Sequence, residues 1–392
     1  MRQFIHRDLW GITLANSQNQ FGTALVAVFV PLFLIGLGLS VRQVALFYLV
    51  YAAVKLIINL PVVQIINRSG SRIGLIYARV ANCLFLLGLA LAVHQSLRWV
   101  IWTLPVWLAF TNAFQFSAQH LHMSRATRTE RLGTDLARIS TISLIATAIA
   151  PAIGATVIAV IGKAGLLVLA FGIVLSSVMW LRSVDKLAGG HQTVQRVHYS
   201  LRDAPWRDVA ANFAFNFHTV AGAMVWPVYL AVVLHSTAKI GAVTAIGTLV
   251  AAVVLLIAGK RTDSRGTKLV LREGSIGSAI VHAGRTLSTS LGYLTGIGIA
   301  WSTVLAYQGN AWTSTYYAHT KTKGIHYIMS MEIACDLAYV TLWGFVYAAL
   351  SFWSEQQAFT TIFVVSAVVA LGCMLITSPA KKAADATLSA RS

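Results

Sequence analysis

The sequence contains few charged residues. Asp, Glu, Lys and Arg make up 11% of its 392 residues, whereas a soluble domain carries roughly 25%. Hydrophobic residues make up 57%, and the mean hydropathy is +0.71. This composition excludes a water-soluble fold, and it equally excludes a soluble fold with a single membrane anchor. It predicts a protein that crosses a bilayer many times.

Acidic residues are especially scarce. Asp and Glu number 12 against 30 Lys and Arg, which gives a net charge of +18. Such a charge could indicate nucleic acid binding, but most of the basic residues lie in alternate loops between apolar segments. The loops on the other side hold few, Arg285 among them. This positive-inside pattern predicts a multi-pass protein of the cytoplasmic (plasma) membrane, with both termini cytoplasmic and no nucleic acid partner.

Cysteine is also rare. Cys83, Cys335 and Cys373 lie in apolar segments and show no CxxC spacing. We therefore expect neither a disulfide framework nor a metal site, and no cofactor. Long polar loops are lacking as well, which leaves no room for a separate soluble domain.

Long apolar segments fill the rest of the chain. A helix that crosses a bilayer needs about 20 residues, and the sequence predicts twelve such segments, at residues 10–38, 43–66, 73–94, 98–121, 135–160, 164–182, 207–234, 238–258, 269–284, 288–317, 325–350 and 357–377. The fold class is therefore all-α and integral to the membrane. We expect an N-terminal bundle at 1–182, a central cytoplasmic loop at 183–206 and a C-terminal bundle at 207–392.

The two halves resemble each other at an offset of 196 residues. Three polar residues and a proline recur at this spacing, since Asn16, Gln20, Thr23 and Pro31 align with Asn212, Asn216, Thr219 and Pro227. The recurrence indicates a duplicated unit of six helices. Internal repeats are typical of secondary transporters, whose site lies between the repeats near the middle of the bilayer.

Two short basic loops recur at the same offset. The first contains Asn67, Arg68, Gly70 and Arg72, and the second contains Gly259, Asp263, Gly266 and Lys268. Glycine permits a tight turn between two helix ends, and basic side chains satisfy the carbonyls of the preceding helix. The loops resemble the signature G-x-x-x-D-(R/K)-x-G-(R/K)-(R/K) of the major facilitator superfamily, although Asn67 stands in the first loop where the family has aspartate.

This resemblance implies two six-helix bundles that rock about a central site. It also implies that the two loops latch one conformation, with Asp263 as the anionic member. Residues 150–154 look like a degenerate Gly-Pro motif of the family's antiporters, with Ala150 in place of the glycine. We expect efflux rather than uptake.

Three ionisable residues lie deep in predicted helices. Glu332 and Asp336 share one face of the eleventh segment, and Lys55 lies near the middle of the second. Buried ionisable groups are costly, so each needs a partner or a water-filled cavity. We predict that Asp336 and Glu332 couple transport to protons and that Lys55 faces the cavity or a carboxylate. In the alternative, the acids pair structurally with Arg138 or with basic residues at the cytoplasmic end. Arg79 and Arg272 lie close enough to that end for their side chains to reach it.

Amide and tyrosine side chains are concentrated on the first, fourth, seventh and tenth segments, which line the cavity in the resembled family. Together with Lys55, we assign to the substrate cavity Asn16, Gln20, Asn112, Gln115, Asn212, Asn216, Tyr307 and Asn310. The alternative is that these amides hold neighbouring helices together.

The sequence thus predicts a monomeric secondary transporter for a small organic solute, with no catalytic residues. An integral-membrane enzyme would need a polar cluster at a helix end. The histidine group His120, His122 and His319 is the only candidate, and it lacks accompanying carboxylates. A non-transporting sensor is a further alternative, which the absence of an appended domain argues against.

Overall fold

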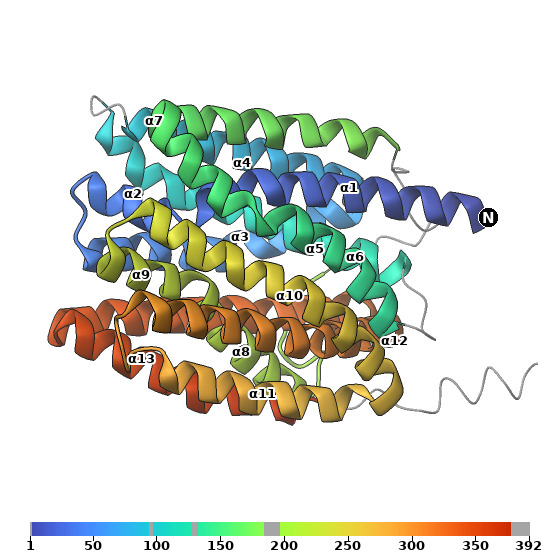
Figure 1. The fold of residues 1–392 in the computed structure, drawn as a ribbon. Helices are drawn as coiled ribbons and strands as arrows, with labels where there is room; N and C mark the ends of the chain where they lie inside the picture. The colour runs from blue at the N-terminus through green and yellow to red at the C-terminus, as the bar shows by residue number, and fades with distance from the viewer. Residues whose placement is uncertain (1, 94–96, 127–131, 184–196, 378–392) are drawn as a thin grey trace, which may run out of the picture.

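The computed structural model describes residues 2–93, 97–126, 132–183 and 197–377. Long helices run side by side along one axis of the molecule (Figure 1), and the described residues contain no strand. The all-α prediction is therefore confirmed.

The N-terminal half is built from seven α-helices and two short 3-10 helices. They are α1 (Arg2–Ala27), α2 (Val30–Gly36), α3 (Val41–Ser69), α4 (Ser71–Val93), η1 (Arg98–Thr103), α5 (Leu104–Ala126), α6 (Leu132–Ala148), α7 (Ala150–Ser176) and η2 (Ser177–Ser183). Prolines mark two of the breaks, because Pro31 and Pro151 stand in the first turns of α2 and α7.

The C-terminal half is built in the same way. Its elements are α8 (Trp206–Val220), the π-helical turn η3 (Ala221–Val225), α9 (Trp226–Leu234), α10 (Thr237–Arg265), α11 (Thr267–Gly284), α12 (Leu291–Phe352), α13 (Glu355–Ala370) and η4 (Leu371–Leu375).

Eight helical stretches among the described residues are long and apolar enough to cross a bilayer. Two of them, residues 136–182 and 291–352, each contain a glycine with positive φ, Gly162 and Gly324, at which the helix breaks. Each of these two stretches therefore holds two of the predicted segments. Helices α5 and α11 hold the fourth and ninth.

The internal repeat is visible in the helix boundaries. Helices α3 and α10 begin and end 196 residues apart, at Val41–Ser69 and Thr237–Arg265. Each ends at a glycine with nearly the same backbone angles, Gly70 at φ 86° and Gly266 at φ 85°. A side chain would be strained in that conformation, so the predicted role of both glycines in a tight turn is confirmed.

The two halves meet along two seams. Helices α1 to α7 pack on one another, and α8 to α13 do the same. Between the halves, α3 packs against the second part of α12, while α6 and α7 pack against α10. We call the end of the molecule with Gly70, Gly266 and Gly324 the basic end, and the end with Gly38 and Gly162 the opposite end.

Candidate functional site

A buried ion pair joins the two halves near the middle of the molecule. The Lys55 ammonium on α3 donates to Asp336 Oδ1 on α12, and Asn59 Nδ2 donates to Asp336 Oδ2 at 2.5 Å. The side chains of Lys55 and Asp336 are 1% and 0% exposed. Lys55 lies fourteen residues into a 29-residue helix, which is roughly 21 Å from its start. The pair is therefore far from water at either end.

A second carboxylate extends this site. Glu332 Oε2 lies 4.0 Å from Lys55 Nζ, and its Oε1 lies 3.5 Å from His120 Nε2 on α5. His120 Nδ1 lies 3.1 Å from the hydroxyl of Tyr317 on α12. The network thus runs through α3 and α5 of one half and α12 of the other. We call Lys55, Asp336, Glu332 and His120 the central charge cluster.

The partner of Asp336 rules out one of the pairings considered from the sequence. Asp336 pairs with Lys55, whereas Arg138 on α6 is exposed. Pairing with Arg138 or with the basic end was the wrong alternative. The expectation that Lys55 faces a carboxylate is confirmed.

A cavity of about 170 Å³ lies on the opposite-end side of the central charge cluster. Its lining comes from α1 to α5 of one half and from Ala223, Met224 and Pro227 of the other. It is mostly apolar, with polar groups supplied by Thr23, Tyr48, Asn82, Thr111 and Asn112. No charged residue is among the lining. Its volume is comparable to that of an engineered cavity of about 150 Å³ that holds benzene.

Of the residues assigned to the substrate cavity, only Asn112 is part of this lining. Asn16 and Gln115 instead surround Arg79 on α4. The Arg79 guanidinium donates to Asn16 Oδ1 at 2.8 Å, to Ser177 Oγ at 3.1 Å and to Gln115 Oε1. Arg79 is 1% exposed. The expectation that it reaches the basic end was wrong, because amide oxygens of α1 and α5 satisfy it inside the bundle.

Apart from Gln20 of α1, the remaining assigned residues lie in the C-terminal half. Asn212 Nδ2 donates to the Met331 carbonyl of α12 at 2.5 Å. Asn216 Nδ2 donates to the Asn212 carbonyl, one turn earlier in α8, at 2.8 Å. Two further contacts lie toward the basic end, where Asn310 Nδ2 donates to Thr262 Oγ1 at 3.2 Å and the Tyr307 hydroxyl donates to Glu273. Gln20 is half-buried. These residues do not converge on one space.

The predicted latch loops lie at the basic end. Asp263 Oδ2 accepts from the Thr134 backbone N–H at 2.9 Å and from its hydroxyl at 2.5 Å, which links the α10 end to the start of α6. Arg68, Lys268 and Gly266 are exposed, whereas Gly259 is buried. Asn67 and Arg72 are partly buried. The contact from Asp263 therefore crosses from one half to the other.

The segment before α8 also spans the two halves. Pro61 has no N–H, which leaves the Ile57 carbonyl of α3 without its helical donor. The Tyr199 hydroxyl lies 3.2 Å from that carbonyl, donates to the Leu56 carbonyl at 2.5 Å and accepts from the Leu60 N–H at 3.2 Å. One residue further on, the Ser200 carbonyl accepts from Ser330 of α12 at 2.7 Å. This segment therefore ties α3 to α12 on the basic side of the central charge cluster.

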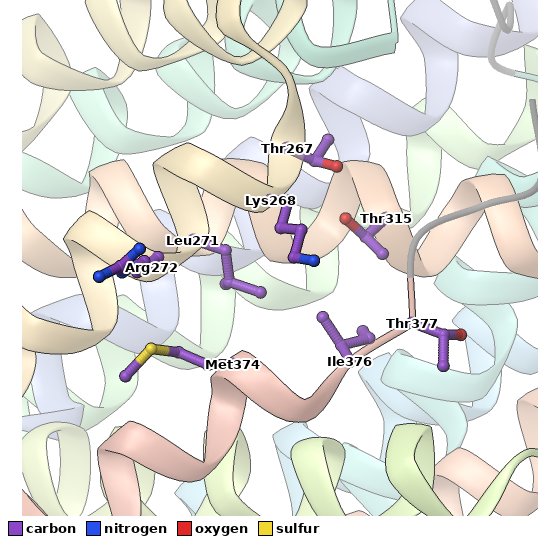
Figure 2. Close-up of a pocket in the computed structure, with 8 residues that line it drawn as sticks. All are labelled: Thr267, Lys268, Leu271, Arg272, Thr315, Met374, Ile376 and Thr377. Carbon is purple, nitrogen blue, oxygen red and sulfur yellow. The ribbon is translucent and has the colours of Figure 1, made fainter.

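A smaller cavity of about 60 Å³ lies at the basic end of the C-terminal half, between α11, α12, η4 and the two residues that follow η4. Figure 2 shows Lys268, Leu271 and Ile376 pointing toward its middle, with Arg272 at its edge. All of its lining belongs to one half. It therefore does not lie on the path between the halves.

The burial of two arginines was not predicted from the sequence. Arg79 was expected to reach the basic end, and Arg285 was expected in an exposed loop. Arg285 is instead 0% exposed and lies among aromatic rings at the end of α11. Nothing in the local sequence distinguishes it from a loop arginine, because its surroundings come from four other helices.

Comparison with known proteins places this geometry in a family. A family model described as Major Facilitator Superfamily matches residues 12–332. No curated protein matches the sequence. Among solved structures, the human organic anion transporter MFSD10 (TETRAN) has a similar fold, with a TM-score of 0.70 and 11% sequence identity. The match covers 93% of this chain and 99% of that one.

Proposed function

Because the chain belongs to the major facilitator superfamily, we propose that it transports a small organic solute by alternating access and couples this movement to protons at the central charge cluster. The observation that carries the proposal is the Lys55–Asp336 pair. It is buried, it lies near mid-depth, and its two members come from different halves of the molecule.

The position of the pair suits a gate. The halves are held together on its basic side by Asn59, by the Tyr199 segment and by Asp263, while the cavity lies on its other side. For the cavity to open toward the basic end, α3 and α12 must separate there. Separation breaks the bond between Lys55 and Asp336, so the state of that bond is linked to which end is open.

The charge balance of the cluster supports a coupling role for protons. Lys55 supplies one positive charge, while Asp336 and Glu332 together supply two negative charges when both are ionised. An excess negative charge in a site away from water is unfavourable, and binding of one proton removes it. We propose Asp336 as the residue that exchanges its proton when it leaves Lys55, with Glu332 and His120 alongside.

The cavity indicates the class of solute. Its lining is apolar with amide and hydroxyl groups and without charge, which suits a solute of one ring with one or two hydrogen-bonding groups. We further propose efflux as the direction, the plasma membrane as the location, cytoplasmic termini and a monomer. The proposed division is residues 1–182, a linker at 183–206, and residues 207–392.

A first experiment tests the solute class with three probes of equal ring size. Thermal unfolding of the purified protein is followed with benzamide, benzoate and benzylamine, because a ligand that binds the folded state raises the unfolding temperature. We expect benzamide to stabilise most. Stabilisation by a charged probe alone would contradict an uncharged cavity.

A second experiment tests coupling in proteoliposomes, with the stabilising probe radiolabelled. Asp336→Asn should abolish accumulation driven by a pH gradient while leaving exchange of labelled for unlabelled probe. Glu355→Gln removes an exposed carboxylate in the first turn of α13 and serves as the matched control. Unchanged pH-driven accumulation in Asp336→Asn would show that this residue does not couple transport to protons.

A further inference from the structure

A buried arginine lies inside the C-terminal half, away from the central charge cluster. The Arg285 guanidinium carbon is 4.6 Å from the ring centre of Trp301, 4.7 Å from that of Trp226 and 5.0 Å from that of Phe363. Two buried histidines adjoin these rings, His282 at 4.8 Å and His218 at 6.0 Å from the Trp301 centre. We call these six residues the Arg285 chamber.

The rings of the chamber offset the positive charge of Arg285 but leave its hydrogen-bond donors unused. An aromatic face within about 6 Å attracts a cation, yet it offers no lone pair of the kind that a carboxylate or carbonyl provides. In the described residues, Nε and Nη2 of Arg285 have no hydrogen-bond partner, and Nη1 reaches the Ala221 carbonyl only at 3.5 Å. The ion pairs in the described part of the chain do not include Arg285.

The contrast with Arg79 is informative, because both arginines are buried inside one half. Arg79 is surrounded by amide and hydroxyl oxygens that accept from its Nε, Nη1 and Nη2. Arg285 has no comparable set of acceptors. His218 adds to the deficit, since neither of its ring nitrogens has a hydrogen-bond partner in the described residues. Both groups lie within 6.0 Å of the Trp301 ring centre, and buried donors without acceptors on neighbouring side chains indicate a missing anion.

The packing limits the size of that anion. Gly222 of η3 lies so close to Trp301 that an added Cβ would be 1.9 Å from the ring. The chamber therefore has no room for a bulky group on that side. The same turn and the start of α9 form its wall toward the 170 Å³ cavity, because Ala223 and Met224 of η3 and Pro227 of α9 line the cavity while Trp226 of α9 contacts Arg285. The turn η3 is π-helical, and π-helical turns frequently occur at functional sites.

The geometry points to an anion site in the C-terminal half, in which the guanidinium of Arg285 and the ring of His218 bind one small monovalent anion. The shared chemistry of the occupant is a single negative charge with compact acceptors. A free halide provides it, and so does the carboxylate of a solute. This inference does not rest on the proposed transport reaction.

Direct binding to the purified full-length protein in nanodiscs tests the site. Radiolabelled chloride and radiolabelled acetate are titrated at constant ionic strength, with sulfate as the background salt. The variants are Arg285→Gln, which removes the charge, and Arg285→Lys, which keeps the charge but loses the planar donors. Lys163→Gln is the matched control, because Lys163 is an exposed cation 5.6 Å from the Phe33 ring centre.

We expect saturable binding of one anion per protein. Arg285→Gln should weaken it by about tenfold or more, since a hydrogen bond to a charged group is lost. Lys163→Gln should bind as the unmodified protein does, and Arg285→Lys should fall between the two. Saturable chloride binding identifies a halide site, whereas saturation by acetate alone identifies a carboxylate site.

Two results would overturn the inference. One is the absence of saturable binding of either anion to the unmodified protein. The other is unchanged binding in a monodisperse Arg285→Gln variant. If that variant does not fold, the isotherm of the unmodified protein and the affinity of Arg285→Lys decide the question. Neither result bears on proton coupling, which is measured in proteoliposomes at a different cluster.

Discussion

Replacing Lys55 with methionine should destabilise the protein more than replacing Asp336 with asparagine. Lys55→Met leaves Asp336 and Glu332 buried together without a cation. Removing one partner of a buried ion pair costs about 3 to 5 kcal/mol. We place Lys55→Met at the upper end of that range, because two carboxylates lose their counter-charge.

Asp336→Asn should cost less, because Lys55 keeps a second partner. Glu332 Oε2 is 4.0 Å from Lys55 Nζ, and two unit charges at that distance attract by about 4 kcal/mol at an effective dielectric constant of about 20. The new amide can also still bond to Asn59. We expect a loss of about 2 kcal/mol, and we expect the double variant to lose at least about 1 kcal/mol less than the sum of the two single losses.

The assay is unfolding of the purified protein in detergent, followed by tryptophan fluorescence. Lys163→Met and Glu355→Gln are the matched surface controls, since both residues are exposed. Acidic pH should partly rescue Lys55→Met, because protons bound by the folded state replace the lost cation and stability then falls as pH rises. Asp336→Asn should not show this rescue. Equal losses in the two single variants, or strictly additive losses, would refute the assignment of Lys55 to both carboxylates.

Two further predictions concern the contacts between the halves. Gly241→Ala should destabilise the α7–α10 seam by about 1 to 3 kcal/mol, because its Cβ would lie 2.7 Å from a backbone oxygen of α7. Gly296→Ala is the control, because no atom lies within 4 Å of the added Cβ, and it should be neutral or stabilising in the same unfolding assay. Equal losses of stability in Gly241→Ala and Gly296→Ala would refute the steric argument. Tyr199→Phe should cost about 1 kcal/mol and speed hydrogen exchange in α3 around Pro61, and unchanged exchange there would show that the hydroxyl does not stabilise that break. Partial burial raises the pKa of Tyr199, so its hydroxyl remains protonated at neutral pH.

The repeat made much of the architecture predictable. The lengths of the apolar segments predicted the helices. The 196-residue offset between the halves recurs in the structure, where α3 and α10 begin and end 196 residues apart. Helix ends were also readable, because proline fixes φ and glycine permits positive φ, and both effects are local whatever surrounds them. The pairing of Gly70 with Gly266 is the clearest case, since both adopt the positive φ that the sequence suggested.

The candidate site was only partly predictable. The free-energy cost of placing an ionisable side chain inside a membrane identified Lys55, Glu332 and Asp336 as residues that need partners. It did not show which partners, because α3 and α12 meet only when the halves pack together. The amide assignments had the same weakness. Asn16 satisfies Arg79 rather than lining the described cavity, and this depends on how α1, α4 and α5 cross.

The sequence by itself determined the membrane environment, the helical fold and the duplicated turns. These follow from composition, from periodicity and from local backbone preferences, which act within a few residues of one another. Tertiary structure alone decided that Lys55 meets Asp336 and that Arg285 lies among three aromatic rings, with its Nε and Nη2 lacking a hydrogen-bond partner in the described residues. Their partners lie tens to hundreds of residues away in the chain, and the strength of an electrostatic contact depends on distance and burial, which only packing sets.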